Sequence, residues 1–152
     1  TSRTRILNAK FIIYIIWCLA LVVSNLIIGL LIGTILQLPS TKINVLYPLL
    51  TDYFITTILT ILIGVPIPFF ALLGKGYLAP LGFVALTLVL AQVIAAIGYG
   101  SYFPWSIPGL YSGAGGAFKN LLDKYSYLIL ILTCIAGYIA TVIYWKNADQ
   151  TK

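Results

Sequence analysis

The residues that most enzymes use for acid–base or metal chemistry are scarce in this sequence of 152 residues. It contains no histidine and no glutamate, and its three acidic residues are Asp52, Asp123 and Asp149. Zinc sites of the HExxH type, Ser-His-Asp hydrolysis, paired glycosidase carboxylates and EF-hands all need residues that are missing here. We therefore expect no catalytic residue, no metal site and no bound cofactor.

One glycine-rich segment has part of the composition of a phosphate-binding loop. The run Gly113–Gly116 precedes Lys119. A P-loop ends in Gly-Lys-Ser/Thr, because the lysine reaches the phosphates and the hydroxyl holds magnesium. Here Phe118 precedes the lysine and Asn120 follows it. The segment is therefore better explained by backbone flexibility than by nucleotide binding.

The composition indicates a membrane protein. Hydrophobic residues make up 61% of the chain and charged residues 8%, and the mean hydropathy is +1.06. Soluble domains are about 45–50% apolar and about 25% charged. The nine basic residues give a net charge of +6, but they are spread singly, so they form no nucleic-acid-binding patch. In a membrane protein such an excess reports topology.

Four apolar segments are long enough to cross a bilayer as helices, which takes about 20 residues each. They are expected at about 11–38, 53–73, 77–98 and 125–145. Thr51 and Asp52 are expected to cap the second helix, and residues 39–52 before it to lie along the outer interface. Cys18 and Cys134 fall within apolar runs and are predicted to be small buried residues rather than a disulfide. The sequence thus predicts an all-α polytopic membrane protein with a single transmembrane domain over residues 1–152.

The basic residues predict the direction of the spans, because cytoplasmic loops and ends carry an excess of lysine and arginine. If the helices alternate, six basic residues lie on one side and three on the other. The larger group is Arg3, Arg5, Lys10, Lys75, Lys146 and Lys152; the smaller group is Lys42, Lys119 and Lys124. Both ends of the chain are therefore expected in the cytoplasm.

Residues 99–124, between the third and fourth spans, cannot form a continuous helix. Pro104, Pro108 and Gly113–Gly116 interrupt it. Irregular backbone is not tolerated in contact with lipid, so this outer segment is expected at the interface or as a re-entrant element in a protein-lined or wet cavity. Its aromatic residues are expected at headgroup depth; they are Tyr102, Phe103, Trp105 and Tyr111.

Asn25 and Gln92 are the strongest polar candidates inside the spans, joined by several threonines, among them Thr56, Thr57 and Thr60. They either line a polar substrate path or form interhelical hydrogen bonds, which average about 0.6 kcal/mol in membranes; the second interpretation is favoured. No span carries a charge, which argues against ion-coupled transport through these helices.

Glycine and proline motifs mark two further positions. Gly29 and Gly33 form a GxxxG motif, which lets two helix backbones approach closely, either within one chain or in a dimer. Pro66 and Pro68 remove two backbone donors from the second span and predict a kink. That kink is either a hinge for gating or a static bend.

Residues 74–113 resemble the permease subunits of type-2 ATP-binding-cassette (ABC) transporters, in particular the branch associated with bacitracin and lantibiotic export or self-protection. The most specific part is Tyr-Phe-Pro-Trp-Ser-Ile-Pro-Gly at 102–109, with Pro104, Pro108 and Gly109. It follows a span that begins with Gly-Tyr-Leu-Ala-Pro-Leu-Gly. Elsewhere the chain resembles these permeases only in hydropathy.

The resemblance implies a six-span protein of the bacterial plasma membrane, of which this chain supplies the last four spans as a fragment. It implies a cytosolic ATPase partner, a second identical or related permease, and an amphipathic substrate such as a peptide antibiotic. Arg3, Arg5 and Lys10 would trail the coupling helix on the ATPase-docking side. The chain itself would be no enzyme. The alternative function is a non-transporting membrane immunity or sensor protein that binds the antimicrobial peptide.

Overall fold

The computed structural model describes residues 3–37, 43–74, 76–113 and 122–147 as helices and short connections. The elements in chain order are α1 Arg3–Ile35, α2 Ile43–Gly64, α3 Ile67–Leu73, α4 Leu78–Ala96, the 3-10 turns η2 Gly100–Tyr102 and η3 Pro104–Ser106, α5 Ile107–Tyr111 and α6 Lys124–Asn147. Over these ranges there is no strand. Four helical stretches, with α2 and α3 counted together, are long and apolar enough to cross a membrane. The predicted all-α polytopic fold is confirmed.

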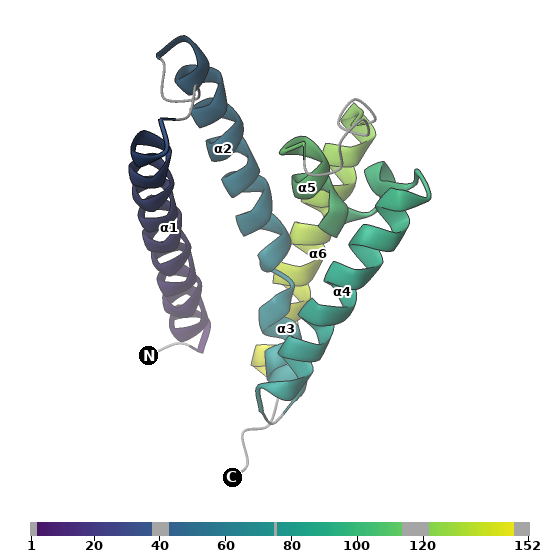
Figure 1. Cartoon of the computed structure of the whole chain (residues 1–152). Helices are drawn as coiled ribbons and strands as arrows, with labels where there is room; N and C mark the ends of the chain where they lie inside the picture. The colour runs from purple at the N-terminus through teal and green to yellow at the C-terminus, as the bar shows by residue number, and fades with distance from the viewer. Residues whose placement is uncertain (1–2, 38–42, 75, 114–121, 148–152) are drawn as a thin grey trace.

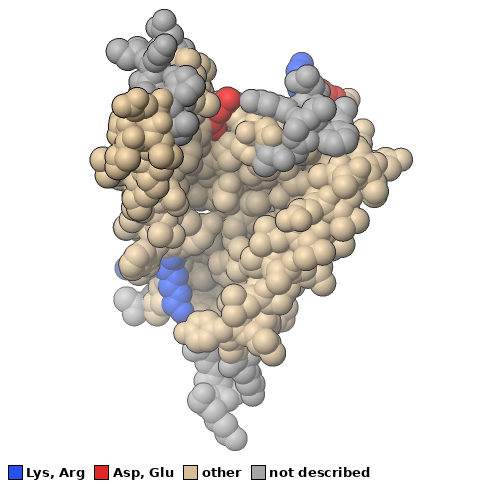
Figure 2. Space-filling view, viewed as in Figure 1, with Lys and Arg blue, Asp and Glu red and all other residues tan. Residues whose placement is uncertain are grey.

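The helices form two groups, which Figure 1 shows from the side. α1 stands beside α2 at one edge, and α3, α4, α5 and α6 gather on the other side. α2 joins the groups, because it packs on α1 as well as on α5 and α6. The start of α1 and the end of α6 lie at the same, lower end of the structure (Figure 1). In Figure 2, uncharged surface covers the middle of this face, and the charged atoms lie above and below it.

The first two helices begin earlier than predicted. α1 starts at Arg3 instead of Phe11, so its basic residues belong to the helix. α2 starts at Ile43 instead of Tyr53, which makes the expected cap at Thr51 wrong. The Thr51 hydroxyl instead donates to the Tyr47 carbonyl at 3.1 Å, as threonine does inside a helix. Because a helix satisfies its own backbone in lipid, it continues through apolar residues that a soluble protein would leave in a loop.

The predicted kink in the second span is a complete break. α2 ends at Gly64, α3 begins at Ile67, and Val65 with Pro66 separates them. Proline lacks the backbone donor that would continue the helix across this point. α3 then packs on α4 and α6. A Cβ atom on Gly137 of α6 would lie only 2.6–2.7 Å from atoms of Pro66, so only glycine lets α6 approach the break.

The outer segment is more deeply packed than an interfacial element. The turn that follows α4 contains Gly98. Its φ is +88°, a left-handed conformation that glycine adopts without strain. The turns η2 and η3 then pack against α4 and α6, and helix α5 packs on α2 and α6. Ile107 and Leu110 are 0% and 2% exposed, and Ile107 joins Leu59 and Leu130 in the main buried cluster. Residues 114–121, with the glycine run and Lys119, lie outside the described residues.

Replacing Gly137 by alanine is expected to lower the stability of the protein. The new methyl group must displace Pro66, and such overpacking costs about 1–3 kcal/mol. Thermal unfolding in detergent micelles measures the change. Gly82→Ala in α4 is the matched control, because nothing lies within 4 Å of its Cβ position. Equal melting temperatures for the two variants would show that the α6 backbone does not need to approach the break.

Candidate transport site between α1 and α2

Two tyrosines connect α1 to α2 through reciprocal hydrogen bonds. The Tyr14 hydroxyl on α1 donates to the Ile61 carbonyl on α2 at 3.1 Å. The Tyr53 hydroxyl on α2 donates to the Val22 carbonyl on α1 at 2.8 Å. A Cβ atom on Gly64 would collide with the Tyr14 hydroxyl, so the glycine makes room for this ring. Each helix therefore supplies one donor and one acceptor to the contact.

A cavity of about 340 Å³ lies along the α1–α2 contact, and we name it the hydroxyl chamber. Its lining residues are Tyr14, Cys18, Leu21 and Val22 of α1 and Tyr53, Thr56, Thr57, Thr60 and Ile61 of α2. Thr57 and Thr60 donate to the carbonyls of Tyr53 and Thr56, each at 2.8 Å. The chamber is thus the place where polar side chains gather between two otherwise apolar helices.

Thr56 differs from the other two threonines of the chamber. Its Oγ1 is buried and has no hydrogen-bond partner within the described part of the chain. Leaving a buried hydroxyl unpaired costs about 1–3 kcal/mol. Because this oxygen is enclosed by protein atoms, it does not face the open space of the chamber.

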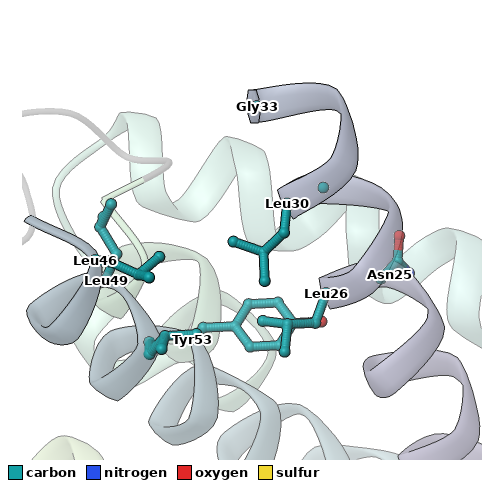
Figure 3. A pocket seen from close by; sticks show the side chains of 9 residues that line it. Asn25, Leu26, Leu30, Gly33, Leu46, Leu49 and Tyr53 are labelled. Atoms are coloured by element: carbon teal, nitrogen blue, oxygen red, sulfur yellow. The ribbon is translucent and has the colours of Figure 1, made fainter. Parts of the chain in front are cut away.

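A second cavity of about 290 Å³ continues the groove, and we name it the leucine cavity (Figure 3). It is lined by Asn25, Leu26, Gly29, Leu30 and Gly33 of α1 and by Leu46, Leu49, Leu50 and Tyr53 of α2. Figure 3 shows the Tyr53 ring reaching from α2 towards α1. Because Tyr53 lines both cavities, its ring lies where the two mainly apolar parts of one groove meet.

The structure separates the two residues predicted to line a polar path. Asn25 lies in the wall of the leucine cavity, whereas Gln92 is exposed on α4. α1 and α4 stand on opposite sides of the structure (Figure 1). Gly29 and Gly33 line the leucine cavity, and nothing lies within 4 Å of the Cβ position of Gly29. Gly29 therefore opens space in this chain instead of forming a close helix contact.

The basic start of α1 is attached to the end of α6. Lys10 Nζ lies 4.8 Å from the ring centroid of Trp145. The Tyr138 hydroxyl donates to Asn8 Oδ1 at 3.1 Å, and its ring lies 5.3 Å from that of Phe11. The Arg5 side chain remains exposed. Of the residues predicted to dock the ATPase, Arg3 is the first residue of α1, and Lys10 attaches α1 to α6.

In the outer segment the aromatic residues divide into a partly buried group and one exposed residue. The ring of Trp105 meets that of Phe83 on α4 edge-on, with the ring centroids 5.4 Å apart. Its centroid lies 5.5 Å from that of Phe103. The Tyr111 hydroxyl donates to Asp52 Oδ1 at 3.5 Å. Tyr102 is 64% exposed. These contacts attach the segment to α4 and α2, and they leave Tyr102 on the surface.

Pro104 and Pro108 are buried, and Gly109 is exposed with open space at its Cβ position. Ser106, also buried, donates to the carbonyls of Gly100 and Phe103, the latter at 2.8 Å. These bonds satisfy backbone groups that the prolines leave outside a regular helix. The irregular backbone is therefore surrounded by protein. This is necessary because unpaired backbone N–H and C=O groups are not tolerated in contact with lipid.

Sequence reasoning identified the threonines of the hydroxyl chamber but not the tyrosines. Tyr14 and Tyr53 look like ordinary members of apolar spans, because their role depends on the register of α1 against α2. Both tyrosines have an eight-residue offset to the acceptor on the same helix, Tyr14 to Val22 and Tyr53 to Ile61. That matched spacing is the one signal in the sequence, and it has meaning only once the two helices are known to pair.

Comparison with known proteins identifies the family. Residues 1–94, more than half of the chain, match the family described as ABC-2 family transporter protein. The chain belongs to the ABC-2 transporter family. It is 26% identical to the bacitracin transport permease protein BCRB of Bacillus licheniformis over 148 residues, which are 97% of this chain and 71% of that protein. No solved structure matches it.

Family membership confirms the resemblance found in the sequence and fixes the broad role of the chain. It is a transport membrane subunit of the ABC-2 family, which is generally non-catalytic. Four apolar helices and this family make it a multi-pass protein of the bacterial plasma membrane. The family also implies assembly with an ATPase and a second permease subunit.

Removing either tyrosine hydroxyl is expected to loosen α1 from α2 in this ABC-2 permease. Tyr14→Phe and Tyr53→Phe each keep the ring and delete one interhelical hydrogen bond, which contributes about 0.5–1.5 kcal/mol. Unfolding by sodium dodecyl sulfate from mixed micelles measures the loss of stability. Tyr77→Phe is the control, because Tyr77 is 87% exposed. If all three variants unfold alike, the two hydrogen bonds do not hold the helices together.

Proposed function

We propose that this chain is the permease subunit of an ABC exporter that moves an amphipathic substrate, such as a peptide antibiotic, with energy from a separate ATPase. Membership of the ABC-2 family supports the transport role. The similarity to a bacitracin transport permease supports a bacitracin-like peptide as substrate. The chain would supply the path and the ATPase would supply the hydrolysis.

The end of the bundle where α1 starts and α6 ends is the proposed ATPase-docking side. It carries Arg3, Arg5 and Lys10 at the start of α1 and Lys146 at the end of α6. The excess of basic residues favours a cytoplasmic position for this end. Because Lys10 and Asn8 contact α6, a displacement of the start of α1 would be passed directly to α6. That contact is a physical route from ATPase closure to the spans.

The groove between α1 and α2 is the proposed section of the transport path in this subunit. It combines hydroxyl groups with an apolar wall, which suits a substrate that is itself amphipathic. Pro66 and Pro68, at the break between α2 and α3, are the proposed hinge. Gly29 and Gly33 line the apolar part of this groove, and Gln92 on α4 would add a polar wall in the assembled complex.

Neutralising the basic end is expected to weaken retention of the ATPase. We expect a neighbouring reading frame to encode an ATPase with a Walker A loop, and affinity purification of the permease should retain it. Replacing Arg3, Arg5 and Lys10 by glutamine should reduce the retained ATPase several-fold. The matched control replaces the three basic residues that alternation of the spans predicts on the other side, Lys42, Lys119 and Lys124.

The two triple variants separate a specific docking surface from a general effect of charge. Loss of the ATPase from the first variant alone supports the proposed side. A permease that retains no ATPase even with its basic residues intact would contradict the exporter function. Peptide binding by such a permease would point to the immunity or sensor protein, for which the exposed Tyr102 offers a contact on the outer segment.

The outer segment is expected to be needed for export more than for insertion into the membrane. Pro104→Ala removes a buried ring, and Trp105→Ala removes the contact with Phe83 at 5.4 Å. Both variants should reach the membrane at near-normal levels and lower bacitracin resistance several-fold. Immunoblots of membrane fractions and inhibitory concentrations measure the two effects. Wild-type resistance in both variants would show that the segment only connects α4 to α6 and has no role in export.

A further inference from the structure

The last turn of α2 leaves the α-helical hydrogen-bond pattern just before the break. In a regular α-helix the Val65 N–H would donate to the carbonyl four residues earlier, which belongs to Ile61. It donates instead to the Leu62 carbonyl, at 3.2 Å. The tightened turn therefore releases the Ile61 carbonyl from its helical donor. Within a bilayer such a carbonyl needs another partner from the protein.

The Tyr14 hydroxyl of α1 supplies this partner. It donates to the Ile61 carbonyl at 3.1 Å. Gly64, the last residue of α2, leaves room for the tyrosine, because a Cβ atom there would collide with the hydroxyl and lie 3.1 Å from the ring carbon that carries it. A side chain of the neighbouring helix thus caps the end of α2 at the break.

The other tyrosine contact between the two helices does not have this role. The Tyr53 hydroxyl donates to the Val22 carbonyl at 2.8 Å. Val22 lies in the middle of α1, which runs without a break over Arg3–Ile35. Its carbonyl has a helical donor four residues later, and the tyrosine adds a second hydrogen bond to the same oxygen. Both tyrosines attach α1 to α2, but only Tyr14 replaces a donor that the break removes.

α6 connects the break to the start of α1. Gly137 of α6 lies against Pro66, and the next residue, Tyr138, donates to Asn8 Oδ1 of α1 at 3.1 Å. Asn8 and Tyr14 are separated by about 9 Å along α1, at 1.5 Å per residue. One segment of α1 therefore contacts both the end of α2 and the part of α6 that packs on the break.

We propose that Tyr14 is a positioning residue for the break between α2 and α3. Its hydroxyl completes the last turn of α2, so that the angle between α2 and α3 follows the position of α1. When α1 is displaced, the Ile61 carbonyl loses its donor and the backbone at the break is free to change its dihedral angles, as hinges do. The use of this angle in transport rests on the proposed function, whereas the cap itself does not.

A distance measured across the break tests the proposal. Spin labels are attached at Ile58→Cys in α2 and Leu73→Cys in α3, which are 58% and 48% exposed. Cys18→Ala and Cys134→Ala remove the native thiols. Double electron–electron resonance on the full-length permease in lipid nanodiscs, without ATPase or peptide, then gives the distribution of distances between the labels.

Tyr14→Phe is expected to widen this distribution about twofold, because the uncapped turn no longer fixes the angle. Tyr53→Phe is the matched control. It removes a hydroxyl from the same pair of helices, but the carbonyl it leaves keeps its helical donor, so the distribution should stay as narrow as in the parent protein.

Gly64→Ala breaks the same contact from the side of α2, since its methyl group must push the Tyr14 hydroxyl away. It should widen the distribution as Tyr14→Phe does, and the double variant should widen it no further, because both substitutions remove one hydrogen bond. Gly82→Ala is the matched control, with nothing within 4 Å of its Cβ position.

The outcomes separate the cap from the exporter function. Widening by Tyr14→Phe and Gly64→Ala, but not by their controls, supports the positioning role. A parent-like distribution in either variant would overturn it, as would equal widening by Tyr53→Phe, and both results would leave the exporter function standing. Failure of the permease and its ATPase to take up peptide would overturn the exporter function and leave the cap in place.

Discussion

The structure depends on one constraint, that every backbone N–H and C=O group within the bilayer needs a partner inside the protein. This is why the spans are long helices, and why α2 already begins at Ile43, in apolar residues that a soluble protein would leave in a loop. It is also why the chain leaves helical structure only where protein surrounds it. The break at Pro66 is covered by α6 at Gly137, and the outer segment folds between α2, α4 and α6.

The same constraint makes the α1–α2 groove unusual. Here two tyrosines and three threonines gather between helices whose other surfaces are apolar. Most of these hydroxyls have backbone carbonyls as partners, and Thr56 does not. A family whose members move substrates across membranes needs sites that bind polar groups without holding charged residues in lipid. Hydroxyl groups meet that need at a far smaller cost of desolvation than ionised side chains do.

The number and type of the spans could be predicted from the sequence, because an apolar helix of about 20 residues matches the thickness of the bilayer. The kink at Pro66 was predictable for a similarly local reason, the missing backbone donor. The start of α2 was predicted wrongly, since Thr51 and Asp52 form a good capping pattern for a helix that in fact begins at Ile43. The contribution of Ile107 to the core and the roles of Tyr14 and Tyr53 depend on helix register and on contacts between distant segments, which no local pattern encodes.

We propose that this chain carries an amphipathic peptide across the membrane in an ATP-driven complex. The most direct measurement is uptake of labelled bacitracin by inside-out vesicles that contain the permease and its ATPase. The account predicts accumulation inside the vesicles that requires hydrolysable ATP and stops when ATP is replaced by a non-hydrolysable analogue. Peptide that binds to the vesicles equally with and without ATP, and is never enclosed, would contradict transport and indicate a binding protein instead.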